Sequence, residues 1–217
     1  MKKATPRRPS PRVAQKRADT RLEILRAAEE IMTDGGIDAV TLASVAGQLH
    51  LTKQALYHYF PSKEALIKSL TTTLLHDEIE SIIATIEAAD SRAGVLGTMI
   101  RAFYAHYIGR LDAFKAIYCQ SQLHSPSGPP IDKLTILEEI NPRTRHLFNI
   151  LENRLSGPSK SKAKRARMRR LAFSAWLSAL GLLTMLSLAD ANQDPLVHSD
   201  KDLLDTLARV FDEAALK

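Results

Sequence analysis

Cysteine is almost absent from this chain, since Cys119 is the only one among 217 residues. No intramolecular disulfide can form, which favours a reducing, cytoplasmic setting. The seven histidines do not show the spacing of a metal site, so we expect neither a metal nor another cofactor. The chain has no G-x-S-x-G, phosphate-loop, HExxH or CxxC motif, and therefore nothing in it indicates an enzyme.

Acidic residues are missing from two strongly basic stretches, residues 1–18 and residues 160–170. The remainder of the chain is net acidic although the whole protein carries +6. Such concentrated charge indicates a polyanion nearby, either nucleic acid or an anionic membrane surface. Because residues 1–18 include three prolines, we interpret them as a disordered basic arm that either binds DNA phosphates or is only solvated. The second stretch is most simply the solvated start of a helix.

No segment alternates with the period of a strand, so the predicted fold is all-α, with about nine helices. The capping-box pattern Thr20-x-x-Glu23 predicts that the first helix begins at residue 20, and Gly35-Gly36 predicts its end. Residues 124–130 are predicted to form a loop. Apolar residues at helical spacing predict further helices at residues 42–49, 53–60, 63–89, 91–110, 112–123, 131–140, 141–155, 160–189 and 199–216.

Charge is also absent from residues 171–189, a stretch almost long enough to span a bilayer. Its leucines are diluted by alanine, serine, glycine and threonine, which favours a helix buried on all sides within protein. The alternative is a membrane-associated helical protein anchored by the basic and apolar helix at 160–189. Solubility without detergent would exclude that alternative.

Residues 41–60 have the pattern of a helix-turn-helix, with threonine at the start of each short helix. In the second helix, steps of 100° place Lys53, Gln54, Tyr57 and His58 on one face. This face contains basic, amide and aromatic side chains and no acid. It therefore suits the phosphates and base edges of a DNA major groove.

The segment from Thr41 to Leu66 closely resembles the DNA-binding signature of the TetR/AcrR family of bacterial transcriptional regulators, above all in Leu56-Tyr57-x-Tyr59-Phe60-x-Ser62-Lys63-Glu64-x-Leu66. The resemblance covers residues 20–66. It departs from the family at His50, where glycine is usual in the turn, and at Gln54, where the residue is often small. The resemblance implies that the residues facing DNA are Thr41, Thr52, Lys53, Gln54, Tyr57, His58, Tyr59 and Lys63.

The same resemblance implies a helix-turn-helix domain at 19–66 and a helical ligand-binding and dimerisation domain at 67–217. It implies a homodimer formed by the last two helices, with small and apolar contact residues Ala172, Ala175, Ala179, Leu183, Leu207 and Phe211. It also implies a pocket for a small, mostly apolar effector among the middle helices. The candidates, each of which could also be plain core, are Phe103, Tyr104, Tyr107, Phe114, Tyr118, Gln122, His146 and Trp176.

The expected function is therefore that of a cytoplasmic repressor that binds double-stranded, palindromic operator DNA as a dimer, without a membrane partner, and is released by a ligand. An activator or a nucleoid-binding protein without a ligand would share these sequence features.

Overall fold

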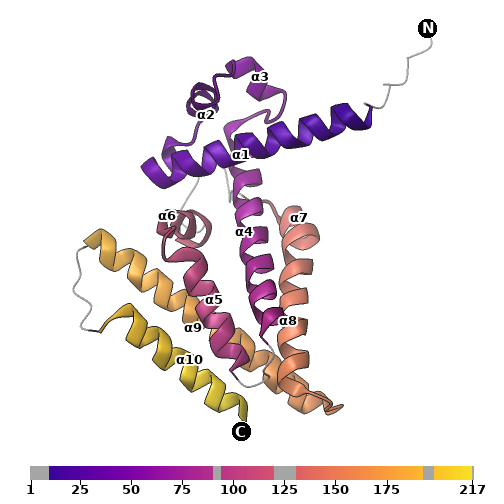
Figure 1. Cartoon of the computed structure of the whole chain (residues 1–217), viewed down its shortest axis with the longest axis vertical. Coiled ribbons are helices and arrows are strands. Elements are labelled where there is room, and N and C mark those ends of the chain that lie inside the picture. The colour runs from indigo at the N-terminus through magenta and orange to yellow at the C-terminus, as the bar shows by residue number, and fades with distance from the viewer. Residues whose placement is uncertain (1–9, 90–93, 120–130, 193–197, 217) are drawn as a thin grey trace. The chain divides into compact units, whose positions relative to one another are not determined.

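The computed structural model describes residues 10–89, 94–119, 131–192 and 198–216, and every regular element in these ranges is helical (Figure 1). The prediction of an all-α fold is confirmed. The chain forms two compact units, one ending at Leu70 and the other beginning at Thr71. Helix α4 (Lys63–Ala88) contributes to both units, and the predicted boundary at 66/67 lies just before the one observed.

The first unit consists of α1 (Pro11–Ala39), α2 (Leu42–Gln48), α3 (Lys53–Tyr57) and the start of α4. Helix α1 buries one stripe of apolar side chains, among them Ile24, Ala28 and Met32. Helix α2 contacts both α1 and α3, and the core is completed by Val45 and Leu56, both without solvent exposure. A small core of this kind holds the short helix α3, which is too short to be stable by itself.

The prediction of a disordered arm is wrong for residues 11–18, which form the first two turns of α1. Pro11 stands in the first turn, where its missing N–H costs nothing. Thr20 is inside the helix, and its hydroxyl donates to the carbonyl of Lys16 at 3.0 Å instead of forming a capping box. Gly36, with φ of 75° and ψ of 175°, is not helical and interrupts α1 where the sequence predicts its end, and a short further helical segment follows to Ala39. Residues 1–9 lie outside the described part.

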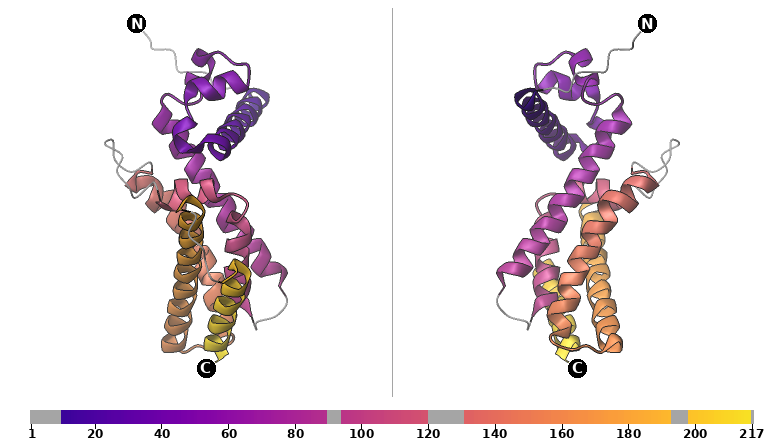
Figure 2. Two further views of the ribbon diagram at one scale, coloured as in Figure 1. Left: turned by 90° about the vertical axis from the view of Figure 1, so that its left-hand side faces the viewer. Right: turned by 90° about the vertical axis from the view of Figure 1, so that its right-hand side faces the viewer.

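The second unit contains the rest of α4 and six further helices. A π-helical turn extends α6 to Cys119 and another joins α7 to α8. Helix α9 contacts α5, α8 and α10, and α10 also contacts α5 (Figure 2). The predicted loop at 124–130 lies outside the described residues. The helices of this unit are α5 (Val95–Tyr107), α6 (Leu111–Phe114), α7 (Lys133–Thr135), α8 (Asn141–Ser156), α9 (Lys162–Asn192) and α10 (Asp200–Leu216).

Helices α5 and α10 approach closely at Gly97. A Cβ atom at this position would collide with the carboxylate of Asp212 and lie 3.2 Å from the Ala208 methyl group. The backbone N–H of Gly97 instead donates to Asp212 Oδ1 at 2.9 Å. Because this amide belongs to the first turn of α5, the carboxylate satisfies a donor that has no partner within the helix. This contact ties α10 to the start of α5.

Helix α9 is apolar on two opposite sides, and the described residues of the chain cover only one of them. Only 33% of its most hydrophobic window is buried, although the helix is long and apolar enough to cross a membrane. The expectation of a helix buried on all sides is therefore wrong for a single chain. Four side chains on the outer side are each about half exposed: Phe173, Leu177, Met185 and Leu188.

This arrangement also corrects the predicted dimer contacts on α9. Ala172, Ala175 and Leu183 have no solvent exposure and Ala179 has 2%, because they face the core of their own chain. They are not available to a second copy. Leu207 and Phe211 on α10 are partly exposed and remain candidates. We use the name outer face for the exposed and half-buried apolar side chains on this side of both helices, namely Phe173, Leu177, Met185, Leu188, Leu203, Leu207, Val210, Phe211 and Ala214.

Candidate functional site

The candidate DNA-reading element consists of α2, a short turn and α3. Thr41 caps α2 in a reciprocal capping box, since its hydroxyl accepts the N–H of Ser44 at 2.9 Å and the Ser44 hydroxyl accepts the N–H of Thr41. Thr52 caps α3 by accepting the N–H of Ala55 at 3.1 Å. Both threonines therefore supply the hydroxyl oxygen that a helix start requires, as their positions in the sequence predict.

The turn between the two helices depends on His50, which has φ of 53° and is the only non-glycine residue with positive φ in the described part of the chain. This left-handed conformation costs a residue with a Cβ about 1–2 kcal/mol. The family resemblance predicts this strain, because glycine usually occupies the position.

Replacing His50 with glycine is expected to stabilise the protein. Removing the left-handed strain stabilises the folded state by more than the extra conformational entropy of glycine stabilises the unfolded chain. The free energy of unfolding should therefore rise by about 0.5–1 kcal/mol. Urea denaturation of the two proteins measures the difference. His58→Gly is the matched control, because His58 is also exposed but has φ of −70°, and it should instead lose stability. A loss of stability in His50→Gly would contradict the prediction.

The exposed face of α3 contains Lys53, Gln54 and Tyr57, with His58 directly after the helix. The Lys53 ammonium lies 6.0 Å from the centre of the Tyr57 ring, at the outer limit of a cation–π contact. On the opposite side, Leu56 is fully buried. The face is thus presented to solvent without an acidic side chain, and it offers the donors and acceptors that base edges and phosphates require.

Two arginines of α1 hold the C-terminal end of α3. Arg17 Nη2 donates to the carbonyl of His58, and Arg21 Nη1 donates to the carbonyl of Tyr59, both at 3.2 Å. Arg21 also lies over the Phe60 ring, 4.3 Å from its centre. The carbonyls at the end of a helix have no helical partner, so these arginines satisfy them. The one hint in the sequence is that residues 17 and 21 continue the buried stripe of α1 toward its N-terminus.

Three of the four remaining predicted DNA-facing residues are less accessible. Thr41 is half-buried, and its hydroxyl is engaged in the capping box. Tyr59 is also half-buried and follows α3. Lys63 is half-buried, and its Nζ donates to the carbonyl of Asp38 at 3.4 Å. Thr52 is exposed beside Lys53. The structure therefore brings five of the eight predicted residues together on the accessible side of α3.

The second unit contains a buried acid that the sequence did not indicate. Glu78 on α4 has 2% exposure. It accepts the hydroxyl of Tyr107 at 2.5 Å and that of Tyr118 at 2.8 Å. Burial raises the pKa of Glu78 to about 7, although the two tyrosine hydrogen bonds oppose this rise. Burial and the carboxyl of Glu78 raise the pKa of both tyrosines well above the ordinary value, so the hydroxyls remain protonated donors.

The two tyrosines that bond to this carboxyl group belong to a cluster of aromatic rings. Phe103 lies edge-on to Tyr107 at 5.4 Å between ring centres and to Trp176 at 6.4 Å. Phe114 lies 5.2 Å from Tyr118. Five of the eight predicted pocket residues thus form one cluster, and Glu78 supplies its polar centre. We use the name aromatic core for Phe103, Tyr107, Phe114, Tyr118 and Trp176.

Comparison with known proteins decides what the N-terminal unit is. Residues 24–70 match the model of the tetR family of bacterial regulatory proteins. The N-terminal unit is a tetR-family domain. An uncharacterized HTH-type transcriptional regulator of Mycobacterium tuberculosis is 33% identical over 66 residues, which cover 30% of this chain and 35% of the relative. The HTH-type transcriptional repressor KstR2 of Rhodococcus jostii is 27% identical over 131 residues, covering 59% of this chain and 61% of KstR2.

The match to the mycobacterial regulator therefore spans about a third of that protein, and the match to KstR2 less than two thirds. Solved structures extend the likeness of fold to nearly the whole chain. FadR of Bacillus subtilis, solved with stearoyl-CoA, has a TM-score of 0.60 at 19% identity, covering 90% of this chain and 97% of FadR. A TetR/AcrR-family regulator of Thermobifida fusca has a TM-score of 0.59 at 19% identity, covering 89% and 97%. The relatives are regulators, in agreement with the expectation that this chain is not an enzyme.

Three predicted pocket residues do not join the aromatic core of the second unit. The Tyr104 hydroxyl donates to Asp200 at the start of α10, and burial together with this carboxylate raises its pKa to about 12. His146 is exposed on α8, so its assignment to an enclosed pocket is wrong. Gln122 lies outside the described residues. Tyr104 bonds to α10 and His146 is exposed to solvent, a distinction that residue type does not reveal.

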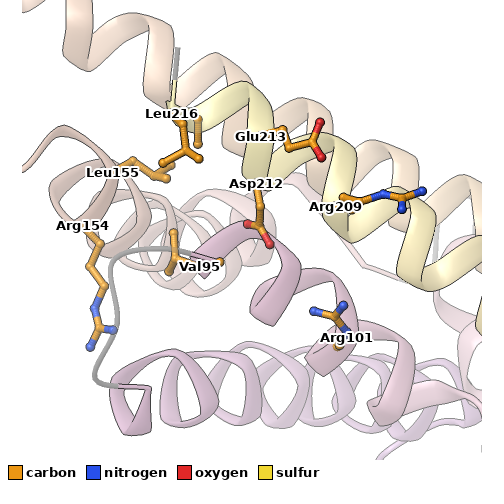
Figure 3. A pocket seen from close by; sticks show the side chains of 10 residues that line it. Val95, Arg101, Arg154, Leu155, Arg209, Asp212, Glu213 and Leu216 are labelled. Carbon is orange, nitrogen blue, oxygen red and sulfur yellow. The ribbon is translucent and has the colours of Figure 1, made fainter.

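A groove of about 690 Å³ lies between α5, α8 and α10, away from the aromatic core (Figure 3). Its charged side chains are largely bound to other groups of the protein. Arg101 pairs with Asp205 at 3.0 Å, Arg154 donates to the carbonyl of Ala89 at 2.5 Å, and Asp212 points toward the first turn of α5. None of the predicted pocket residues lines this groove, and its charges serve mainly to join the helices.

Proposed function

We propose that this protein is a cytoplasmic transcriptional repressor that binds a near-palindromic operator as a homodimer and is released from it by a small molecule. The observation that carries the proposal is the exposed, acid-free face of α3 on a tetR-family helix-turn-helix. Lys53 suits a guanine edge or a phosphate, Gln54 an adenine edge, and Tyr57 a phosphate or a thymine methyl group.

The outer face supports the dimer. It is apolar, it runs along two neighbouring helices, and the described part of the chain leaves its side chains exposed or only half-buried. Pairing of this face across a two-fold axis buries it in both copies, as a self-complementary interface requires. Two recognition helices related by the same axis would read half-sites about 34–36 Å apart, which is one turn of DNA.

The aromatic core supports regulation by a ligand. Aromatic bodies with a few polar tips are typical of sites that hold mostly apolar small molecules. Among the neighbours, FadR of Bacillus subtilis was solved with stearoyl-CoA, and KstR2 is named as a repressor. Release of DNA then follows if the ligand binds one of two conformations more tightly than the other.

Selection of binding sequences from random duplexes tests the DNA-binding proposal. We expect a near-palindromic consensus. Against it, Gln54→Ala should lose about 30- to 25,000-fold in affinity, because the dimer loses one bidentate base contact in each half-site and each contact provides about 1–3 kcal/mol of discrimination. The loss should fall on one base position in each half-site. Thr33→Ala, another exposed truncation in the same unit, is the matched control and should bind like the wild type.

The absence of any enriched sequence would contradict the operator proposal. Recovery of the protein only in the membrane fraction would contradict the dimer, because the same apolar outer face would then be in contact with lipid. A small-molecule screen with the selected operator tests release. An operator complex that no compound dissociates would favour an activator or a nucleoid-binding role.

A further inference from the structure

The N-terminal end of α1 continues past the helix-turn-helix without another helix beside it (Figure 1). Residues 11–19 are all exposed, in contrast to the buried stripe that begins at Ile24. From Pro11 to Arg21 the helix extends about 15 Å, at about 1.5 Å per residue. Packing against the core does not explain why these turns are helical, so we expect them to make another contact.

This end of α1 is nevertheless fixed to the DNA-reading helix. Arg17 binds the carbonyl of His58 and Arg21 that of Tyr59, immediately after α3. Arg21 also donates to Ser69 Oγ at 2.7 Å. The two arginines therefore couple the direction of α1 to the end of α3, and the turns N-terminal to Arg17 keep a defined orientation relative to the recognition face.

Arg12 and Lys16 lie four residues apart, on one side of these turns. Neither side chain has a hydrogen-bond or ion-pair partner among the described residues. Asp19 is the one acid between residues 10 and 21, and it accepts a hydrogen bond from Gln15 at 2.8 Å. The two cations thus form an exposed basic stripe on the N-terminal turns of α1.

We propose that this stripe is a second DNA-contacting surface, in which Arg12 and Lys16 bind phosphates of the duplex flanking the operator half-site. The proposal rests on the DNA-binding function proposed above. Duplex DNA carries one charge per about 1.7 Å of axis, and the two residues are about 6 Å apart along the helix, so they reach separate phosphates. A pre-ordered helix loses less conformational entropy on binding than a flexible arm.

The decisive variant is Arg12→Gln combined with Lys16→Gln, studied in the full-length protein. Each neutralised phosphate contributes about 0.9 to the slope of log affinity against log salt. Because the operator complex contains two protomers and therefore four of these cations, we expect the slope to fall by about 3.6, and the affinity at 0.1 M salt to fall by about 100- to 4,000-fold. The loss should be equal for selected and random duplexes, because phosphates carry no sequence information.

The matched control is Lys133→Gln combined with Lys201→Gln, which removes the same charge from exposed sites in the second unit and should leave the slope unchanged. A further variant, Ala18→Pro, keeps every charge but breaks the helix between the stripe and Arg21. It should lose most of the same slope if the fixed helix, and not charge alone, makes the contact.

An unchanged slope in the Arg12 and Lys16 double variant would overturn the proposal. If Ala18→Pro kept the salt dependence of the wild type, the contact would not require the fixed helix, and a flexible basic arm would explain it instead. Wild-type protein that prefers no selected duplex would instead overturn the underlying operator function, so the two failures are distinguishable. Loss of slope in both variants, with an unchanged control, supports the second surface.

Discussion

Leu177→Glu is expected to convert the homodimer into monomers and to lower operator affinity by at least 100-fold. Leu177 lies in the middle of the outer face and is 47% exposed in the single chain, so the glutamate is solvated in the monomer. Pairing of the outer faces would bury two carboxylates in an apolar interface, which costs several kcal/mol for each charge. Sedimentation velocity at micromolar concentration measures the change in mass.

The loss of DNA binding follows from the loss of the second half-site. A dimer binds its second half-site as an intramolecular step, and such linkage raises affinity by about 10²–10⁴-fold over one module. The matched control is Leu134→Glu, an equally drastic change at a 61% exposed leucine on α7. It should remain a dimer with normal affinity. A dimeric Leu177→Glu protein would show that the outer face is not the interface.

The sequence indicates correctly that α9 is apolar on both sides, but it does not indicate which side faces the core of the chain. Both sides of this helix are apolar, and the small residues at 172, 175 and 179 indicate close approach without showing which helix approaches. In the structure they lie against their own chain. Larger residues, Phe173 and Leu177, form the other side. Only the positions of α5, α8 and α10 distinguish the two sides, and those positions depend on tertiary packing.

The helix-turn-helix was predictable because its signals are local. The threonine caps, the buried Leu56 and the exposed face of α3 all follow from spacings of a few residues. The start of α1 was not predictable in the same way. Thr20 and Glu23 match a capping box, but the helix-forming residues before them continue the helix to Pro11. A local motif therefore fails where a neighbouring segment supports the same conformation.

The contacts that refine the site join distant parts of the sequence. Arg17 meets His58 across 41 positions, and Glu78 meets Tyr107 across 29. Nothing in the pattern of either segment indicates these pairs. Glu78 in particular appears in the sequence as one of several acids on an amphipathic helix, between Asp77 and Glu80. Its burial is decided by the aromatic residues that α5 and α6 bring against α4.

Glu78→Gln is expected to make the protein about 3 kcal/mol more stable at pH 8 but less than about 1 kcal/mol more stable at pH 5. The folded-state pKa of Glu78 is about 7, raised by burial from 4.5. A raised carboxyl pKa means that the folded state holds its proton more tightly than the unfolded state. The stability contributed by the neutral carboxyl is therefore complete below pH 4.5 and is lost as pH rises toward 7. At about 1.4 kcal/mol per pKa unit, the loss is about 3 kcal/mol.

The glutamine variant has no such loss, because its side chain is neutral at every pH and keeps hydrogen-bonding capacity for both tyrosines. Urea denaturation between pH 5 and 8 should therefore give wild-type and variant curves that separate as pH rises. The tyrosine pKa values are raised further above this range. His76 and His106 titrate with lowered pKa values, but they do so in both proteins and cancel in the difference. The matched control is Glu80→Gln, at an exposed acid on the same helix, and its stability should follow that of the wild type across the pH range. If the difference in unfolding free energy between wild type and Glu78→Gln were the same at every pH, the carboxyl group of Glu78 would be charged throughout the range, and the prediction would be wrong.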